Sequence, residues 1–250
     1  MNAIGVIPAR LASTRLPEKV LANICGKPML RHIWEAAIKA RMLDDVIIAT
    51  DDARVVKAAK SFGAKAVLTS VDHKSGTDRV TEVVNPLDVK VVVNIQADEP
   101  LIHTTMINDL ARALLENKDL VMATLIKKIV DEKDIFDPNV VKVVLDKDDF
   151  AIYFSRAAIP YNREGQPGKF LTQNHYRHIG IYAYTKDFLF TYANMPSSKL
   201  EAIEKLEQLR VLESGYKIKA IETPYETMSV DTQEDLDKVI NLVKTKTGGA

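Results

Sequence analysis

Short runs of β-branched and apolar residues alternate with helical patterns along most of the chain, and this alternation limits the possible folds more than any other feature. The first strand-like run is Ala3–Pro8 and the second is Val46–Thr50. Between and after them, Met29–Met42 and Ala53–Phe62 have apolar residues at helical spacing. A strand, a helix and a further strand in succession imply parallel pairing with right-handed crossovers. The sequence therefore predicts an α/β fold with a doubly wound, mostly parallel sheet.

The rest of the chain continues this pattern as one domain over residues 1–250, without an internal repeat. Further strands are expected at Ala66–Thr69, Val89–Gln96, Leu120–Ile126, Val140–Leu145, Ala151–Phe154, His178–Tyr184 and Lys217–Glu222. Further helices are expected at Thr77–Val84, Met106–Glu116, Leu200–Gly215 and Thr232–Lys244. The polar segment Asn162–Gln173 is expected to form a loop or an edge of the substrate region, and the tail Thr245–Ala250 is expected to fray.

Charge and hydropathy exclude several classes of protein. The formal net charge is +0, so no overall field attracts nucleic acid or an anionic membrane. No apolar run approaches the roughly 18 residues of a membrane span. Residues 1–5 lack the features of a signal peptide, and the single Cys25 cannot form an internal disulfide. We expect a soluble, cytoplasmic protein with no nucleic-acid or membrane partner.

Residues 7–19, IPARLASTRLPEK, carry more positive charge than a surface turn needs. Pro8 and Pro17 disfavour a helix here. Because ligands of open α/β sheets bind at the carboxyl ends of strands, a loop after the first strand lies at the expected binding edge. Guanidinium and ammonium groups bind phosphate oxygens well, although a basic solvent-exposed loop remains an alternative. The side chains available for binding are Arg10, Ser13, Thr14, Arg15 and Lys19.

The sequence lacks both G-x-x-x-x-G-K-[ST] and a G-x-G-x-x-G turn after its first strand. A P-loop enzyme or a dinucleotide-binding protein is therefore not supported.

Acidic residues follow another buried run, in NIQADEP (residues 94–100). Gln96, Asp98 and Glu99 come at the carboxyl end of the expected strand, opposite the cationic loop. Carboxylate oxygens are suitable ligands for Mg²⁺. A simple turn is the alternative, because Asp and Pro both favour turns.

A third polar segment, SVDTQEDLDKV (residues 229–239), opens the last expected helix. Asp231 has the position of an N-cap, with Glu234 three residues later as in a capping box. The same residue can also bind a ligand, since a cap lies at a junction between a loop and a helix.

These motifs, in this order, resemble those of the CMP-sugar synthetases, and more narrowly those of the 3-deoxy-manno-octulosonate cytidylyltransferases (CMP-Kdo synthetases). The similarity runs from Met1 to about Val243, and YFSRAAIP, RHIGIY and LEQLR are its most specific parts. Ala97 and Glu18 depart from the family pattern, where glycine is usual. The matching segments are IPAR, STRLPEK, GKPML, IATDD, SGTDR, NIQADEP, DPNVVKVV, YFSRAAIPY, RHIGIYAY, EKLEQLRVLE and SVDTQEDL.

The resemblance implies transfer of a cytidylyl group from CTP to the anomeric hydroxyl of 3-deoxy-D-manno-octulosonate (Kdo), with release of pyrophosphate, for lipopolysaccharide synthesis. It also implies a Rossmann-like nucleotidyltransferase fold, a smaller sugar-binding and dimerisation insertion at about residues 130–215, and a homodimer. Catalytic roles fall to Arg10, Lys19, Asp98 and Asp231, with Mg²⁺ on the two aspartates. The nucleotide-binding residues implied are Pro8, Ala9, Arg10, Arg15, Lys19, Ser75, Gly76, Asp78, Arg79 and Gln96. The sugar-binding residues implied are Arg15, Gln96, Arg156, His178, Tyr182, Glu207 and Gln208.

Several of these residues have a structural alternative. Residues 75–79 contain a plausible helix start at Gly76–Thr77. Glu207 and Arg210 have the i,i+3 spacing of an ordinary helical pair. Arg156 could form an ion pair, His178 could be a core histidine, and one of Tyr182 and Tyr184 could lie in the core. Zinc is not favoured, because His175 and His178 lack a third ligand nearby.

Other functions also remain open. The substrate could be 8-amino-Kdo or a sialic acid, or the chain could be a non-catalytic sugar-nucleotide-binding protein. Such a silent protein would be expected to lose Lys19, Asp98 or Asp231, and all three are present.

Overall fold

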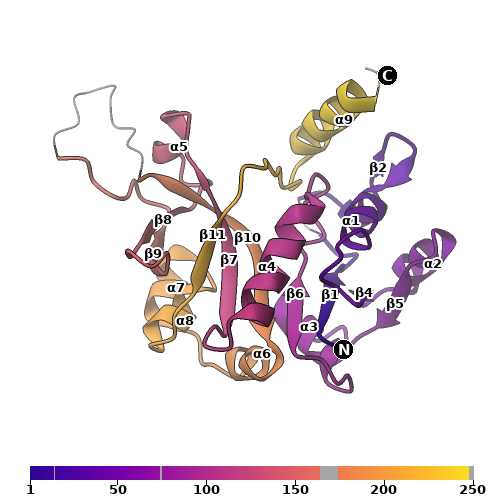
Figure 1. Ribbon diagram of the computed structural model, residues 1–250. Helices are drawn as coiled ribbons and strands as arrows, with labels where there is room; N and C mark the ends of the chain where they lie inside the picture. The colour runs from indigo at the N-terminus through magenta and orange to yellow at the C-terminus, as the bar shows by residue number, and fades with distance from the viewer. Residues whose placement is uncertain (14, 74, 164–173, 248–250) are drawn as a thin grey trace.

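The computed structural model describes residues 1–13, 15–73, 75–163 and 174–247 (Figure 1). Thr14, most of the loop expected at 162–173, and residues 248–250 of the expected tail lie outside the described residues. Within the described part, no helix is long and apolar enough to cross a membrane.

In the described residues, nine strands form one sheet, whose main path runs β11-β7-β10-β6-β1-β4-β5. The pairs β1–β4, β1–β6, β4–β5 and β7–β11 are parallel, whereas β10 runs antiparallel to β6 and β7. The predicted doubly wound, mostly parallel sheet is confirmed. The strands are β1 (Ala3–Pro8), β4 (Asp45–Thr50), β5 (Lys65–Leu68), β6 (Val91–Asn94), β7 (Met122–Lys128), β8 (Lys142–Leu145), β9 (Ala151–Ser155), β10 (Tyr176–Thr185) and β11 (Lys219–Glu222).

Helices cover both faces of this sheet. Alternate residues of β1 enter different apolar clusters: Ala3 and Ile7 pack with α1, α2, α4 and α9, whereas Ile4 and Val6 pack with α3, α6 and α8. The helices are α1 (Met29–Ala37), α2 (Ala53–Ser61), α3 (Gly76–Val84), α4 (Thr104–Glu116), α5 (Lys133–Phe136), α6 (Lys186–Ala193), α7 (Lys199–Glu204), α8 (Leu209–Glu213) and α9 (Gln233–Thr247).

The predicted helix Leu200–Gly215 is wrong as one continuous element. A capping box between Ser198 and Glu201 starts α7, and Lys205 ends it with a left-handed φ of 54°. The chain then runs through residues 205–208 before α8 begins at Leu209. The break exposes polar side chains of this segment to a cavity while Leu206 and Leu209 stay buried.

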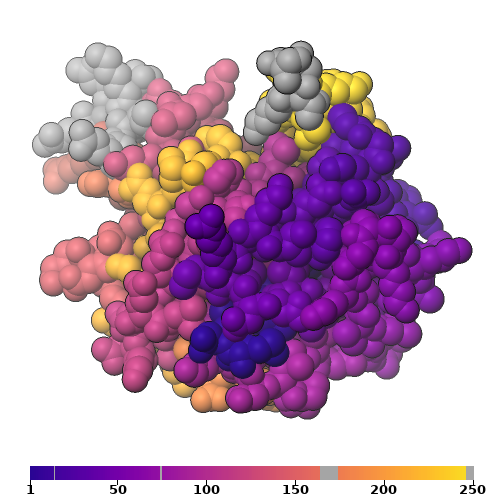
Figure 2. All heavy atoms as spheres, turned by 45° about the vertical axis from the view of Figure 1, so that its right-hand side comes forward, coloured from indigo at the N-terminus to yellow at the C-terminus, as the bar shows by residue number. Residues whose placement is uncertain are grey.

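The last helix packs against a hairpin from the first thirty residues. A short hairpin, β2 (Asn23–Ile24) with β3 (Lys27–Pro28), follows the one-turn helix η1 (Lys19–Leu21). Helix α9 packs against β2, as Figures 1 and 2 show, and the Cys25 thiol lies 3.8 Å from the carbonyl oxygen of Ile240. The strands β8 and β9 lie on the other side of the molecule, together with α5, α7 and α8 (Figure 1).

Candidate active site

Lys19, at the start of η1, joins two carboxylates from distant parts of the chain. Its Nζ lies 3.0 Å from Asp98 Oδ2, in the turn after β6, and 3.0 Å from Asp231 Oδ1, just before α9. Arg15 Nη2 lies 3.0 Å from the other oxygen of Asp231. The Lys19 side chain is only 13% exposed. The three predicted charged segments therefore converge on one point.

The sequence placed Asp231 at the N-cap of the last helix, but in the structure a different residue caps this helix. The capping pair is Thr232 with Asp235: Asp235 Oδ2 accepts from the backbone N–H of Thr232, and Thr232 Oγ1 accepts from the N–H of Asp235. The predicted Asp231–Glu234 box is therefore displaced by one residue. Asp235 also accepts from the N–H of Asp231, and this leaves the Asp231 carboxylate for Lys19 and Arg15.

A cavity of about 410 Å³, here called the cationic cavity, surrounds this cluster. Its lining includes most of the residues predicted to bind nucleotide: Pro8, Arg10, Arg15, Lys19, Ser75, Gly76, Arg79 and Gln96, together with Asp98 and Asp231. Two predicted residues do not line it. Ala9 is fully buried, and its N–H donates to Ala49 O. Asp78 forms a capping box with Ser75 at the start of α3. The alternative of a helix start is thus correct for this segment.

Arg79 lines the cationic cavity, but its guanidinium is already paired. It is 3% exposed and donates to Asp51 Oδ2 at 2.9 Å and to Ser70 O at 3.2 Å, and it also contacts Thr69. We interpret Arg79 as a support of the cavity wall. The other arginine and lysine side chains that line the cationic cavity, Arg10, Arg15 and Lys19, come from the opening loop.

Glu18, where the resembling family has glycine, adopts a left-handed conformation with φ of 53°. This backbone region favours glycine, which explains the family preference. The Glu18 carboxylate lies 2.6 Å from Arg54, so the side chain points to the surface and removes no charge from the cluster. Ala97, the other departure, lines the cationic cavity as a small residue.

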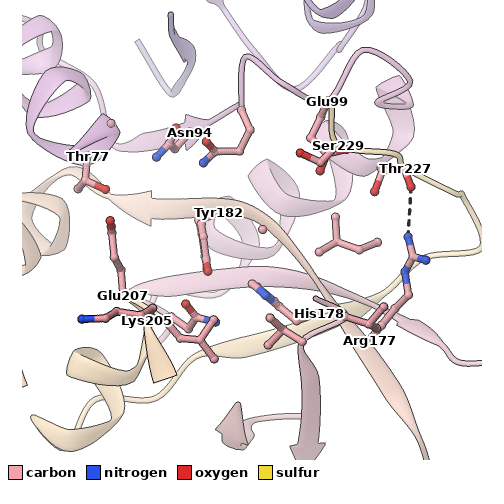
Figure 3. A pocket seen from close by; sticks show the side chains of 18 of the residues that line it. Thr77, Asn94, Glu99, Arg177, His178, Tyr182, Lys205, Glu207, Thr227 and Ser229 are labelled. Atoms are coloured by element: carbon pink, nitrogen blue, oxygen red, sulfur yellow. Dashed lines mark hydrogen bonds between the residues drawn. The ribbon is translucent and has the colours of Figure 1, made fainter. Parts of the chain in front are cut away.

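A second cavity of about 480 Å³, here called the β10 cavity, adjoins the first (Figure 3). Gly76, Gln96 and Glu207 line both cavities and so form a shared wall. The predicted sugar-binding residues in the β10 cavity are Gln96, His178, Tyr182, Glu207 and Gln208. Tyr182 and Tyr184 stack on the same face of β10, and Tyr184, 1% exposed, is the core member of the pair.

Burial keeps His178 uncharged. Its Nε2 lies 2.9 Å from Thr124 Oγ1, and desolvation lowers the pKa of the imidazole to about 3. A neutral imidazole can hydrogen-bond a sugar but cannot neutralise its carboxylate.

Two carboxyl groups of the β10 cavity have raised pKa values. Desolvation raises the pKa of Glu207, and Arg210 does not pair with it, because the Arg210 guanidinium binds Glu201 instead. The alternative of a Glu207–Arg210 helical pair is therefore wrong. Burial, followed by the nearby charge of Asp98, raises the pKa of Glu99 to about 8. Neither group is firmly held as a carboxylate by a neighbouring cation.

Arg156, predicted to bind the sugar, lies outside the lining of both cavities. Its Nε donates to Glu204 O and its Nη1 to Pro138 O, both at 2.8 Å. These bonds connect the end of β9 with the residue before Lys205 and with the loop before β8. Arg156 therefore supports the segment that lines the β10 cavity without lining the cavity itself. Its guanidinium binds backbone carbonyl oxygens, which differs from the ion pair given as the alternative.

Sequence reasoning did not single out Asn94, Arg177 or Lys205, which line the β10 cavity, and it considered Glu99 only for a metal site. Arg177 Nη2 donates to Thr227 O at 3.2 Å (Figure 3). Strict strand alternation would place Arg177 and His178 on opposite faces of β10, yet both line the β10 cavity. The only available signal was the position of Arg177 beside His178 in RHIGIY.

Comparisons with known proteins agree with this architecture. The cytidylyltransferase family model matches residues 4–220. The 3-deoxy-manno-octulosonate cytidylyltransferase of Solibacter usitatus (strain Ellin6076) is 50% identical over 96% of this chain and 94% of its own length. The enzyme of the same name from Fusobacterium nucleatum subsp. nucleatum is 48% identical over 98% of each chain. The solved structure of CMP:2-keto-3-deoxy-manno-octonic acid synthetase complexed with CTP has a TM-score of 0.92 and 40% identity, covering 98% of this chain and 100% of its own.

Proposed function

The chain belongs to the cytidylyltransferase family, among the 3-deoxy-manno-octulosonate cytidylyltransferases, and we propose that it performs their reaction where its two cavities meet. It is a nucleotidyltransferase that transfers a cytidylyl group from CTP to Kdo. The observation that carries the assignment of sites is the wall of Gly76, Gln96 and Glu207 shared by a cationic cavity and a polar one.

In this proposal the triphosphate of CTP occupies the cationic cavity. Arg10, Arg15 and Lys19 neutralise its charge, and the sugar hydroxyl approaches the α-phosphorus from the β10 cavity. The sugar hydroxyl forms the new bond to the α-phosphorus as pyrophosphate leaves. The protein therefore contributes mainly positioning and charge stabilisation. Two adjoining cavities with one shared wall meet this requirement.

Asp98 and Asp231 fit a role in holding Mg²⁺. Both carboxylates already accept from one cation, Lys19 Nζ, so their oxygens face a common point. Within the described residues no group of three or more His, Cys, Asp or Glu side chains could hold a metal. Two carboxylates suffice for Mg²⁺, which takes its remaining ligands from phosphate and water. When bound, the ion would stabilise charge on the phosphates and lower the pKa of the sugar hydroxyl.

The sugar acid would occupy the β10 cavity. Arg177 and Lys205 are cations in its described lining and can offset the sugar carboxylate, which neutral His178 cannot. Gln96 and Glu207, on the shared wall, lie nearest to the reacting hydroxyl in this arrangement. Tyr182 and Gln208 offer hydrogen bonds to the remaining hydroxyls.

We also propose a homodimer that forms through the region of residues 130–215. Large apolar side chains are exposed there, namely Val130, Phe136, Ile152, Tyr161 and Ile203. In the described residues β8 is the one strand that pairs with β9, and beyond Ala151, whose N–H donates to Ile218 O, the outer edge of β9 is open to a partner strand. Sedimentation of the wild type and of Ile152→Lys tests this proposal, since only the wild type should sediment as a dimer. A cytoplasmic location is proposed with it, in line with the single cysteine.

Pyrophosphate release tests the function directly. The purified chain is assayed with CTP and Mg²⁺ in the presence of Kdo, 8-amino-Kdo or a sialic acid, and without sugar. The proposal requires release that depends on both CTP and Kdo and stops when Mg²⁺ is chelated. Preferred turnover of another sugar acid would change the assigned substrate, and release without any sugar would contradict transfer.

A further inference from the structure

The buried polar atoms without a hydrogen-bond partner share one location. Among the described residues these side-chain atoms are Asn94 Oδ1, Glu99 Oε2 and Gln208 Nε2, and all three residues line the β10 cavity. Asn94 is 3% exposed, Gln208 4% and Glu99 8%.

Such atoms are unusual in a folded protein. Buried polar groups nearly always have a partner, because an unpaired one has lost its bonds to water without replacement. Three of them around one cavity therefore indicate a polar molecule that supplies the missing bonds. Two oxygens and one amide nitrogen suit a ligand with several hydroxyl groups, which can both donate and accept.

The three residues come from separate elements that the fold holds in place. Asn94 ends β6 and pairs in register with Tyr182 of β10. Glu99 follows in the next turn, where Thr227 hydrogen-bonds its carboxyl group. Gln208 precedes α8. In Figure 3, Asn94 and Glu99 lie on one side of the cavity, across from Lys205 and Glu207.

We propose that Asn94 and Glu99 are specificity-determining residues, each of which hydrogen-bonds a hydroxyl group of the sugar substrate. This inference rests on the proposed function, which assigns a sugar acid to the β10 cavity. Because Lys205 can pair with the substrate's carboxylate, the polyol part of the sugar lies across the cavity from it, against Asn94 and Glu99 (Figure 3). Gln208 also has an unpaired side-chain atom, Nε2, and we expect it to hydrogen-bond the same sugar from another wall of the cavity.

The proposal separates stability from activity. If the unpaired atoms hydrogen-bond the substrate, they destabilise the unliganded protein, because they are buried there without a partner. Their replacement by apolar groups of similar shape removes this destabilisation. Asn94→Leu and Glu99→Met should then leave the unfolding temperature without sugar unchanged or raised. Glu99→Gln keeps an oxygen acceptor and serves as the conservative variant. Thr223→Val is the matched control, because Thr223 is 2% exposed, accepts from the N–H of Tyr225 and lines neither cavity.

The kinetic experiment uses Kdo and analogues that each lack one hydroxyl. With Kdo, Asn94→Leu and Glu99→Met should lose about 10- to 100-fold in kcat/KM for the sugar, with little change in the KM of CTP. For a sugar that lacks the hydroxyl bound by the substituted residue, the kcat/KM of the variant should fall almost no further. The kcat/KM of the wild type should fall with this sugar by about the same 10- to 100-fold. Glu99→Gln should recover much of the loss, and Thr223→Val should lower the unfolding temperature without altering the ranking of analogues.

Three results would overturn the assignment while leaving the proposed function intact. One is an equal loss for every analogue in a variant. Another is a lower unfolding temperature with unchanged sugar kinetics, which would make these residues structural. If wild-type enzyme turns over Kdo and all single-deoxy analogues equally, the cavity holds only water at these atoms and the inference is wrong. Failure of wild-type enzyme to use any sugar acid with CTP would instead overturn the function and the inference together.

Discussion

Lys19 Nζ lies 3.0 Å from Asp231 Oδ1, although 212 residues separate the two in sequence. The same ammonium contacts Asp98 at 3.0 Å, and the N–H of Val230 donates to Asp98 O. The site is thus closed by the segment that leads into the last helix. The first loop of the chain, the middle of the sheet and the C-terminal helix must all be in place before the charged cluster exists.

Asp231→Asn should separate metal binding from helix capping. Because Thr232 and Asp235 cap α9, the substitution should change the free energy of unfolding by no more than about 0.5 kcal/mol. Loss of one carboxylate charge should raise the Mg²⁺ concentration needed for half-maximal turnover and slow the reaction. Thermal unfolding and a magnesium titration of pyrophosphate release measure the two effects.

Asp235→Ala is the control for this variant and should behave in the opposite way. It removes the acceptor of the Thr232 N–H and so should cost about 1 kcal/mol of stability, with wild-type magnesium dependence. Unchanged magnesium dependence in Asp231→Asn would remove that residue from the metal site.

Asp98→Asn combined with Asp231→Asn should lose much less activity than the product of the two single losses. Residues that act on one ion are not additive once either is gone. The comparison needs kcat for all four proteins at saturating Mg²⁺. Strictly multiplicative losses would mean that the two aspartates act independently.

Arg156→Lys should weaken sugar binding while leaving CTP binding unchanged. A lysine ammonium cannot reproduce the forked contacts to Glu204 O and Pro138 O, so the segment before Lys205 should loosen. We expect a loss of about 1 kcal/mol of stability and a higher KM for Kdo. Calorimetric titration with each ligand separately provides the test, and an equal loss for both ligands would contradict the supporting role.

His178 should stay neutral across the working pH range. Its pKa falls to about 3 in the folded protein, whereas an unfolded histidine titrates near 6.5. Because the unfolded state takes up this proton first, the contribution to stability should be lost as pH falls from about 6.5 towards 3. Between pH 7 and pH 5, the free energy of unfolding of His178→Asn should therefore fall by about 1–2 kcal/mol less than that of the wild type. An NMR titration that shows the His178 ring protonating above pH 6 would contradict this.

The overall architecture could be predicted because it depends on local patterns. The first strand was predicted with its observed bounds, Ala3–Pro8, since an apolar run between polar segments has few alternatives. The cationic cluster was predictable because Arg15, Lys19, Asp98 and Asp231 all follow or precede regular elements at one edge of the sheet. The helix over Leu200–Gly215 was not, because the apolar spacing continues across a break that Lys205 makes by adopting a left-handed backbone.

Other features depend on contacts that a single sequence does not contain. Lys142 is fully buried, and its ammonium donates to the carbonyl oxygens of Asp137, Val140 and Arg156. A lysine in a strand pattern would ordinarily be assigned to the surface. Arg177 lines the β10 cavity beside His178 against strand alternation, and Glu99 reaches the same cavity from the turn after β6, so neither position has a periodic signal.

The most direct test of the account is the kcat for pyrophosphate release by Lys19→Met with CTP, Kdo and Mg²⁺. Lys27→Met is the matched control, since Lys27 also forms an ion pair, at 2.7 Å with Glu35, but lines neither cavity. Loss of a cation directed at the transferring phosphoryl group should lower kcat about 100-fold or more. Lys27→Met should keep wild-type kcat, and both variants should unfold cooperatively. A folded Lys19→Met enzyme with near wild-type kcat would contradict the account.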